Sequence, residues 1–242
     1  MRQVLDISTK SWLVFIVALF FVEAAWGDSQ HIEIRTFMIQ SHLAQIDGKT
    51  VLVVGDSIVE SWLAKPIGTC QTLNAGLGGG GVLDAITLLH KLKQNPERAK
   101  LSGIIVAIGV NDAQRMVLPP NYVTKWKINY AKMIDLALQL NSRVAVSTVL
   151  PVEDGMPLGT KYFDPILIKR LNALIRQVAK EKGVQLIDAS KAFRRLKWER
   201  HYTVDGVHLT PNAYKVFANE LLSGVSNLCA IKNKQSHSAT LN

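Results

Sequence analysis

Five short runs of apolar, largely β-branched residues recur after residue 50, and each stops at a glycine, proline, asparagine or aspartate. Within a run the residues do not alternate between apolar and polar. Continuous runs of this kind are typical of strands that are buried on both faces. They cover residues 51–54, 72–73, 103–108, 144–150 and 184–187, of which the second is the weakest. The pattern predicts a buried parallel sheet of five strands.

Apolar residues at steps of three and four fall between these runs and after the last one, as they do in amphipathic helices. One such pattern ends at Gly183, and the last begins at Thr210 and Pro211, an N-cap residue followed by a proline at the first helical position. Strand and helix alternate along the chain. This predicts an α/β protein with a three-layer sandwich, in which helices cover both faces of the sheet.

At 242 residues, 48% hydrophobic and 19% charged, the chain can bury its own core and is unlike a disordered or coiled-coil sequence. We expect one domain over residues 49–225, a lead-in helix at 28–48 and a tail at 226–242. The net charge of +9 comes from scattered Lys and Arg rather than from a block. Nucleic-acid binding is therefore not expected, while association with an anionic membrane or polysaccharide surface stays open, as does the oligomeric state.

The N-terminus carries an unbroken apolar run over residues 12–22, preceded by Arg2 and Lys10 and followed by the small residues Ala25 and Gly27. Eleven residues are about half of what a bilayer span needs. We expect residues 1–27 to be a secretory signal peptide cleaved near Asp28, with an uncleaved N-terminal anchor as the alternative. Either one predicts a periplasmic or secreted protein.

Cys70 and Cys229 are the only cysteines. In an oxidising compartment they can pair, but geometry decides this and the sequence slightly favours two separate buried thiols. Neither has a second cysteine or a histidine at the spacing of metal ligands, so no metal site is expected.

Polar residues stand where the predicted strands end and before the last helix. They form four segments, 55–58, 74–81, 109–112 and 205–208. In an open parallel sheet, ligands bind outside the carboxyl ends of the strands. We therefore expect a hydroxyl, an imidazole, a carboxylate, an amide and a flexible backbone to meet in one cleft.

Those groups suffice for nucleophilic catalysis. Ser57 needs a base to attack, and His208 can take its proton and later return it to the leaving group. Asp205, three residues before His208, can hold the other ring nitrogen and stabilise the imidazolium. The backbone N–H groups of Ser57 and Gly79 and the side-chain amide of Asn111 can serve as oxyanion donors, each typically worth about 3 kcal/mol.

The segments Gly55-Asp56-Ser57-Ile58, 74–79, Gly109-Val110-Asn111-Asp112 and Asp205-Gly206-Val207-His208 resemble four ordered blocks of the SGNH/GDSL hydrolase superfamily. The resemblance spans residues 50–222. It implies a flavodoxin-like three-layer fold and ester hydrolysis by a serine mechanism without metal or cofactor. By position, Ser57 is the nucleophile, Gly79 and Asn111 are oxyanion donors, and Asp205 and His208 complete the triad.

Two features depart from the family pattern. The second block runs into four glycines, 78–81, so Gly76 or Gly78 is an alternative donor, with Gly79 preferred because the family's donor usually stands five residues after the Asn. The residues after Ser57, 58–60, lack the Thr that many members carry.

Other side chains near these segments have simpler interpretations. Asp56 and Asp112 are expected to accept local backbone N–H bonds. The remaining histidines lack ligand spacing and are expected to be surface or hydrogen-bonded residues, with His201 the least certain because it is close to Asp205. We expect packing or rim positions for Trp62, Trp198 and Tyr202.

Two other classes of function fit the sequence less well. The segment 76–81 satisfies the G-x-G-x-x-G pattern of dinucleotide-binding proteins, but it follows the second strand and no acidic residue closes a strand about twenty positions later. A non-catalytic binding module is disfavoured because no member of the catalytic set is missing.

The sequence thus predicts hydrolysis of a carboxylic ester, carrying a short acyl chain or a glycan O-acyl group, through an acyl-enzyme. Acyl transfer to an alcohol by the same residues is the alternative. Loops such as 153–163 and 196–202 are expected to set the acyl chain and the alcohol.

Overall fold

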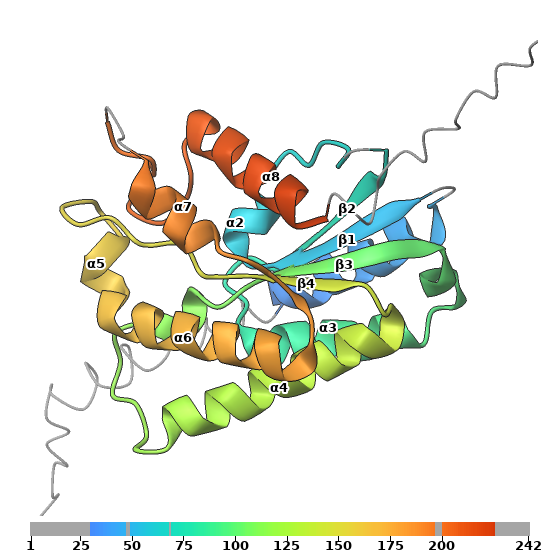
Figure 1. Ribbon diagram of the computed structural model, residues 1–242, viewed down its shortest axis with the longest axis horizontal. Coiled ribbons are helices and arrows are strands. Elements are labelled where there is room, and N and C mark those ends of the chain that lie inside the picture. Colours follow the sequence, from blue (N-terminus) through green and yellow to red (C-terminus); the bar gives the residue numbers. More distant parts are fainter. Residues whose placement is uncertain (1–29, 47–48, 68, 197–199, 226–242) are drawn as a thin grey trace, which may run out of the picture.

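The computed structural model describes residues 30–46, 49–67, 69–196 and 200–225. Its centre is a sheet of five strands, all parallel, in the order β2-β1-β3-β4-β5, which is the flavodoxin-like order. The predicted fold class is confirmed (Figure 1). The strands are β1 (Thr50–Gly55), β2 (Gln71–Gly76), β3 (Leu101–Ala107), β4 (Val144–Ser147) and β5 (Gln185–Ile187).

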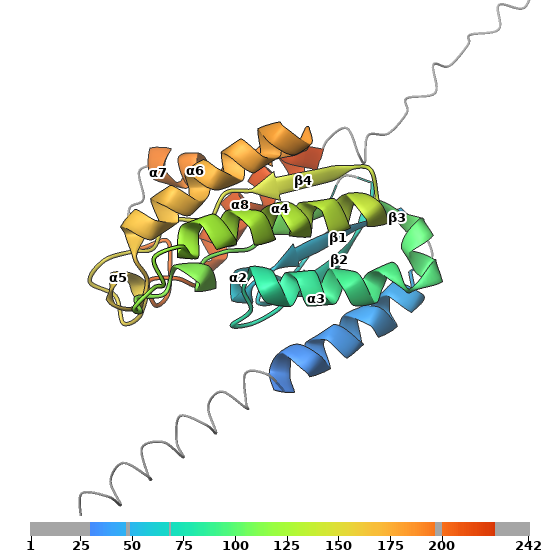
Figure 2. The same ribbon diagram turned by 90° about the horizontal axis from the view of Figure 1, so that it is seen from below.

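Helices cover both faces of the sheet, as Figures 1 and 2 show. On one face lie α3 (Val82–Lys93), α4 (Tyr122–Leu140) and α6 (Pro165–Lys182). On the other lie α2 (Ser57–Glu60), α7 (Ala189–Arg195) and α8 (Pro211–Val225). The shorter elements are η1 (Pro96–Lys100), η2 (Asn111–Ala113) and α5 (Gly159–Tyr162). Right-handed crossovers account for the positions of α2, α3, α4 and α6, because β1 connects to β2 in one direction across the sheet and every later strand is added in the other. The helices α7 and α8 follow the last strand.

Helix ends follow the signals in the sequence. The Asp164 side chain caps α6 by accepting a hydrogen bond from the Ile166 N–H at 2.8 Å, and Gly183 ends this helix in the left-handed conformation, with φ of 64°. Thr210 lies before α8 and its hydroxyl accepts a bond from the Ala213 N–H. These local choices agree with the tertiary arrangement.

Strand β4 is shorter than its apolar run. The prediction reached residue 150, but pairing stops at Ser147. The Val149 N–H donates to Asn172 Oδ1 at 2.7 Å, and the Val149 carbonyl accepts from Asn172 Nδ2 at 2.9 Å. A buried side chain of α6 thus replaces the neighbouring strand as the hydrogen-bond partner of this backbone.

A further helix occupies residues 30–44, in the segment for which a lead-in helix is expected. It lies beside α3, close to the edge strand β2 (Figure 2). Arg35 contacts the end of β2, and Asn95 contacts the Gln40 carbonyl. Ile39 and Leu43 lie on the inner face of this helix, and both side chains are fully buried.

The predicted signal or anchor at 1–27 and the predicted tail at 226–242 lie outside the described residues. Within the described ranges, no helix combines the length and the apolar character that crossing a membrane requires. Cys70 is disulfide-bonded, so the slight preference for a free thiol at this position is wrong. Its only possible partner within the chain, Cys229, lies in the tail.

Candidate active site

The hydroxyl of Ser57 stands at the carboxyl end of β1, the strand at which the order of the sheet reverses. Strand β1 ends at Gly55, and Asp56 caps the turn that follows by accepting a hydrogen bond from the Ile58 N–H at 3.0 Å. Ser57 is the first residue of α2. Every residue of β1 is buried, so this turn is held by the core of the molecule.

Ser57, His208 and Asp205 form one hydrogen-bonded chain. His208 Nε2 lies 2.9 Å from Ser57 Oγ, and His208 Nδ1 lies 2.6 Å from Asp205 Oδ2. The two partners on either side of the ring are 151 and 3 residues away in the sequence. A neutral imidazole that donates from Nδ1 to the carboxylate presents Nε2 as the proton acceptor for the hydroxyl.

Asp205 is held in its ionised form. Partial burial by itself raises the pKa of this carboxyl, but hydrogen bonds from the His208 ring and from the backbone N–H groups of His208 and Val207 outweigh it. The two backbone bonds measure 2.8 and 2.9 Å. The net effect lowers the pKa below its usual value, which suits a residue that stabilises a protonated imidazole.

The segment that carries Asp205 and His208 has little regular structure and is held from residues 153–159. Leu158 N–H donates to the Asp205 carbonyl at 2.7 Å, and Glu153 N–H to the Gly206 carbonyl at 2.9 Å. The Glu153 carboxylate accepts from both the backbone N–H and the hydroxyl of Thr203, and that hydroxyl accepts from the Gly206 N–H. Sequence reasoning assigned Glu153 to a substrate loop and missed this contact, because no local pattern marks it.

The N–H groups of the glycine tract differ in whether they have a hydrogen-bond acceptor. Gly76 N–H donates to Asn74 Oδ1, and Gly78 N–H donates to Glu60 Oε2. Gly80 N–H donates to the Leu77 carbonyl, and Gly81 N–H donates to Asp84 Oδ2. The Gly79 N–H alone has no acceptor among the described residues. Gly79 has φ of 73°, a conformation that favours glycine. This pattern favours Gly79 over Gly76 and Gly78 as the donor.

Asn111 lies next to that tract. Its Nδ2 donates to the Gly80 carbonyl at 3.0 Å, which fixes the side chain and leaves the second hydrogen of the amide for another acceptor. Asn111 is the first residue of η2, just beyond the end of β3. This hydrogen bond connects the loop after β3, which carries Asn111, to the glycine tract, which carries Gly79.

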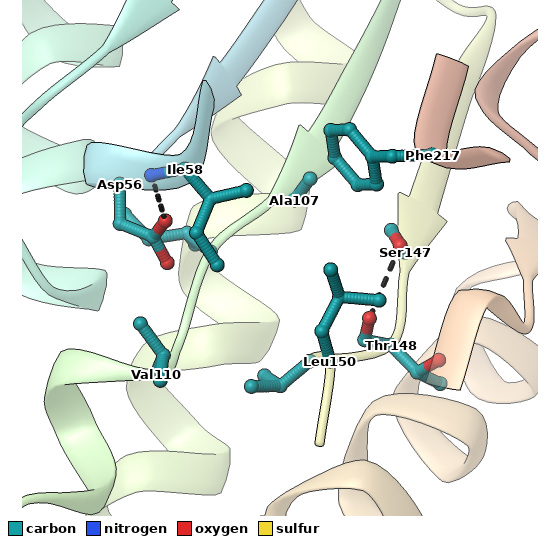
Figure 3. A pocket seen from close by; sticks show the side chains of 10 residues that line it. Asp56, Ile58, Ala107, Val110, Ser147, Thr148, Leu150 and Phe217 are labelled. Atoms are coloured by element: carbon teal, nitrogen blue, oxygen red, sulfur yellow. Dashed lines mark hydrogen bonds between the residues drawn. The ribbon is translucent and has the colours of Figure 1, made fainter. Parts of the chain in front are cut away.

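Asp56 is a buried carboxyl directly behind Ser57. Burial raises its pKa to about 6, and the hydrogen bonds from the N–H groups of Ile58, Val110 and Gly109 only partly offset this effect. Figure 3 shows the cavity beside it, of about 20 Å³, whose walls include Ala107 and Phe217. A largely apolar wall explains why the charged form is disfavoured.

Asp112 is the second buried carboxyl. It accepts a hydrogen bond from the Val82 N–H at 3.2 Å. Burial raises its pKa to about 7, the Val82 bond offsets part of this rise, and the negative charges of Asp56 and Asp84 add to it. Asp56 accepts a local backbone N–H bond, as expected, whereas the backbone partner of Asp112 is not local but lies 30 positions away, at the start of α3.

The remaining candidates take other positions. His201 Nδ1 lies 3.2 Å from Glu153 Oε1, away from the Ser57 hydroxyl, and Trp62 packs edge-on against Phe217. The Tyr202 hydroxyl donates to the Pro151 carbonyl. Trp198 lies outside the described residues. Among the residues that the structure describes, no group of three or more His, Cys, Asp or Glu is arranged to hold a metal ion.

The glycine tract is not built for a pyrophosphate. The N–H groups of Gly78, Gly81 and Val82 donate to the carboxylates of Glu60, Asp84 and Asp112. Phosphate-binding loops leave such groups free and surround them with positive potential. The dinucleotide alternative therefore finds no support at this site.

Comparisons with known proteins identify the family and the fold. The profile of the GDSL-like Lipase/Acylhydrolase family matches residues 53–216. No curated protein matches the sequence.

Three solved structures illustrate the likeness of fold. One is a Streptococcus pneumonia protein provisionally described as a platelet activating factor, with 20% identity, 86% of this chain and 98% of that chain covered, and a TM-score of 0.69. A GDSL-like lipase from Bacteroides thetaiotaomicron has 19% identity, 79% and 97% coverage and a TM-score of 0.61. An acetyl xylan esterase from Geobacillus stearothermophilus has 16% identity, 74% and 95% coverage and a TM-score of 0.56. At these identities the likeness concerns the fold.

Proposed function

The chain belongs to the GDSL-like lipase/acylhydrolase family, and from this premise we propose that it is a serine esterase that hydrolyses a carboxylic ester through an acyl-enzyme. The observation that carries the proposal is the hydrogen-bonded chain from Ser57 Oγ through His208 to Asp205. Alone, a hydroxyl is a poor nucleophile near neutral pH, and in this hydrogen-bonded series His208 is the base that activates it.

In the acylation step, Ser57 Oγ attacks the ester carbonyl carbon while His208 Nε2 takes the hydroxyl proton. The carbonyl oxygen becomes an oxyanion, for which the N–H groups of Ser57 and Gly79 and the Asn111 amide are the donors. Asp205 stabilises the imidazolium through Nδ1. The imidazolium then protonates the alcohol oxygen, the carbon–oxygen bond breaks, and the acyl group stays on Ser57.

In the deacylation step, His208 Nε2 takes a proton from water, and the hydroxide attacks the acyl carbon. The same donors hold the second oxyanion. Its collapse returns the proton to Ser57 Oγ and releases the carboxylic acid, so the enzyme regains its starting state.

For the substrate, we propose an ester of a short acyl chain, including an O-acetyl group of a glycan. The support is the acetyl xylan esterase among the structures of like fold. The net charge of +9 is compatible with an anionic surface or polysaccharide that carries such groups.

The test is hydrolysis of p-nitrophenyl acetate, butyrate, octanoate and palmitate, together with acetate release from acetylated xylan. We expect the highest kcat/KM on the short acyl esters and loss of turnover in Ser57→Ala. Failure of the unaltered protein on every ester, or undiminished turnover in Ser57→Ala, would overturn the proposal. Adding an alcohol and measuring the ratio of transferred to hydrolysed acyl groups separates hydrolase from acyltransferase.

The proposal extends to location. Residues 1–27 would deliver the enzyme to the periplasm or the outside of the cell, or hold it at the membrane. Fractionation of cells that produce the full-length chain, with and without residues 1–27, tests this. Equal recovery of both forms in the cytoplasm would contradict it.

A further inference from the structure

The family profile matches residues 53–216, so the helix over residues 30–44 lies outside it. This helix nevertheless contacts the glycine tract, residues 76–81. Arg35 on this helix donates from Nε and from Nη2 to the Gly76 carbonyl, both at 3.1 Å. Its side chain is only 15% exposed. A nearly buried guanidinium with two bonds to one carbonyl fixes the start of the glycine tract.

Glu60, at the end of α2, links this helix to the next part of the tract. Its Oε1 lies 3.5 Å from Arg35 Nε and 3.0 Å from His31 Nε2. Its Oε2 accepts the Gly78 N–H at 2.5 Å. His31 Nε2 also lies 3.1 Å from this second oxygen. Three partners, Arg35, His31 and the Gly78 N–H, therefore restrict the orientation of the carboxylate.

The position of Gly79 depends on this contact. A Cβ added to Gly79 would meet nothing within 4 Å, so there is open space on that side of the residue. The residue before it is held by the bond from Gly78 N–H to Glu60, and the residue after it by the bond from Gly80 N–H to the Leu77 carbonyl. The direction of the Gly79 N–H follows from these two anchors.

We propose that Glu60, held by Arg35 and His31 of the helix over residues 30–44, is a positioning residue for the oxyanion donor Gly79. This inference rests on the proposed esterase function. Glu60 acts through the loop and does not touch the substrate. Arg35 also contributes a positive charge. The guanidinium offsets the repulsion that the negative Glu60 carboxylate would otherwise exert on the oxyanion.

Because Arg35 both fixes the glycine tract and offsets the charge of Glu60, the proposal predicts a specific order of kcat values among variants at positions 35 and 60. Glu60→Ala removes the acceptor, and kcat is expected to fall about 10- to 100-fold with little change in KM, because displacing a donor should cost less than the roughly 10²- to 10³-fold that complete removal of one typically costs. Glu60→Gln keeps an acceptor oxygen and should stay within about threefold of the unaltered enzyme. Arg35→Gln removes the guanidinium charge and leaves the Glu60 carboxylate with its His31 contact. This variant should lower kcat more than Glu60→Gln does, and the double variant should recover part of that loss.

A helix that merely stabilises the fold would give a different result, because each variant would then lose melting temperature and keep its kcat. The matched control is Glu181→Ala. Glu181 also forms an ion pair, with Lys127 at 2.9 Å, but on the helices α4 and α6. We expect this control to keep kcat, KM and loop behaviour.

A readout that needs no activity completes the experiment. Amide hydrogen exchange of residues 77–81 should be faster in Glu60→Ala than in the unaltered protein and in Glu181→Ala, with Glu60→Gln restoring protection. Unchanged exchange together with unchanged kcat in Glu60→Ala would overturn the proposal. An unaltered protein without esterase activity would overturn the proposed function instead, and exchange alone would then decide the role of Glu60.

Discussion

The two sides of the candidate site are held in different ways. Ser57 follows a strand that is buried at every residue and paired on both sides, so the sheet itself holds the nucleophile. Asp205 and His208 stand in a segment whose pairing is one isolated bridge, Thr203 to Leu209. Side-chain contacts from Glu153 hold that segment. The nucleophile side is therefore inseparable from the stability of the fold, whereas the imidazole side can be disturbed with the fold intact.

The largest effect is expected on the imidazole side, from His208→Ala. Without the base, Ser57 keeps its place but loses its activation, and kcat should fall by roughly 10⁴ to 10⁶. The melting temperature should change by only a few degrees because His208 lies on the irregular segment. Steady-state kinetics and thermal unfolding on the same preparation check both statements.

His201→Ala is the matched control for that variant. It removes a histidine seven positions earlier that contacts Glu153 and does not reach Ser57. We expect its kcat to stay within about threefold. Equal losses in the two variants would show that the segment, rather than the imidazole of His208, matters.

The next effect in size is that of Asp205→Asn. The amide can still accept a backbone bond, but it cannot stabilise the imidazolium or select the ring tautomer. A loss of kcat of roughly 10³ to 10⁴ is expected, with the fold retained. Kinetics combined with circular dichroism tests this, and a loss below tenfold would contradict the role of Asp205.

Glu153→Ala tests the contact that holds the imidazole side. It deprives the Thr203 N–H and hydroxyl of their acceptor, so His208 should lose its fixed distance to Ser57, and kcat should fall about 10- to 100-fold. Glu153→Gln should recover most of the rate. Asp154→Ala, which removes the neighbouring exposed carboxylate bonded to Thr160, serves as control and should leave the rate unchanged.

The smallest effect concerns stability on the nucleophile side. The pKa values of Asp56 and Asp112 are raised to about 6 and about 7, from 3.8 in the unfolded chain. Between about pH 4 and 7 the folded protein therefore binds more protons than the unfolded chain, and the free energy of unfolding falls as pH rises. Asp112→Asn should remove on the order of 2 kcal/mol of this fall.

Urea unfolding at pH 4.5 and 7.5 measures that difference. Asp205 acts in the opposite direction, because its lowered pKa contributes stability at neutral pH that is lost only as the pH falls through that low value. In Asp205→Asn, the free energy of unfolding should therefore still fall between pH 4.5 and 7.5. An Asp112→Asn curve parallel to that of the unaltered protein would contradict the assignment.

The sheet was the more predictable part of the fold. The run at 51–54 became β1 with one residue added at each end, because a strand buried on both faces is a continuous apolar run. The run at 72–73 grew to Gln71–Gly76, because β2 pairs with β1 along its full length. Within it, Asn74 Nδ2 binds the Val59 and Trp62 carbonyls at 2.6 and 3.0 Å, a long-range contact that no local pattern indicates.

The sequence by itself determined the order of apolar runs and polar segments, and so the edge of the sheet at which Ser57, Asn111 and His208 gather. This follows because the carboxyl ends of parallel strands share one edge. Only the tertiary structure decided that the Gly79 N–H has no acceptor among the described residues, that Glu60 and Glu153 contact the two sides of the site, and that Cys70 is disulfide-bonded. The contacts of Glu60 and Glu153 join residues 18 and 50 positions apart, and which partner a side chain meets at such a separation depends on how the layers pack.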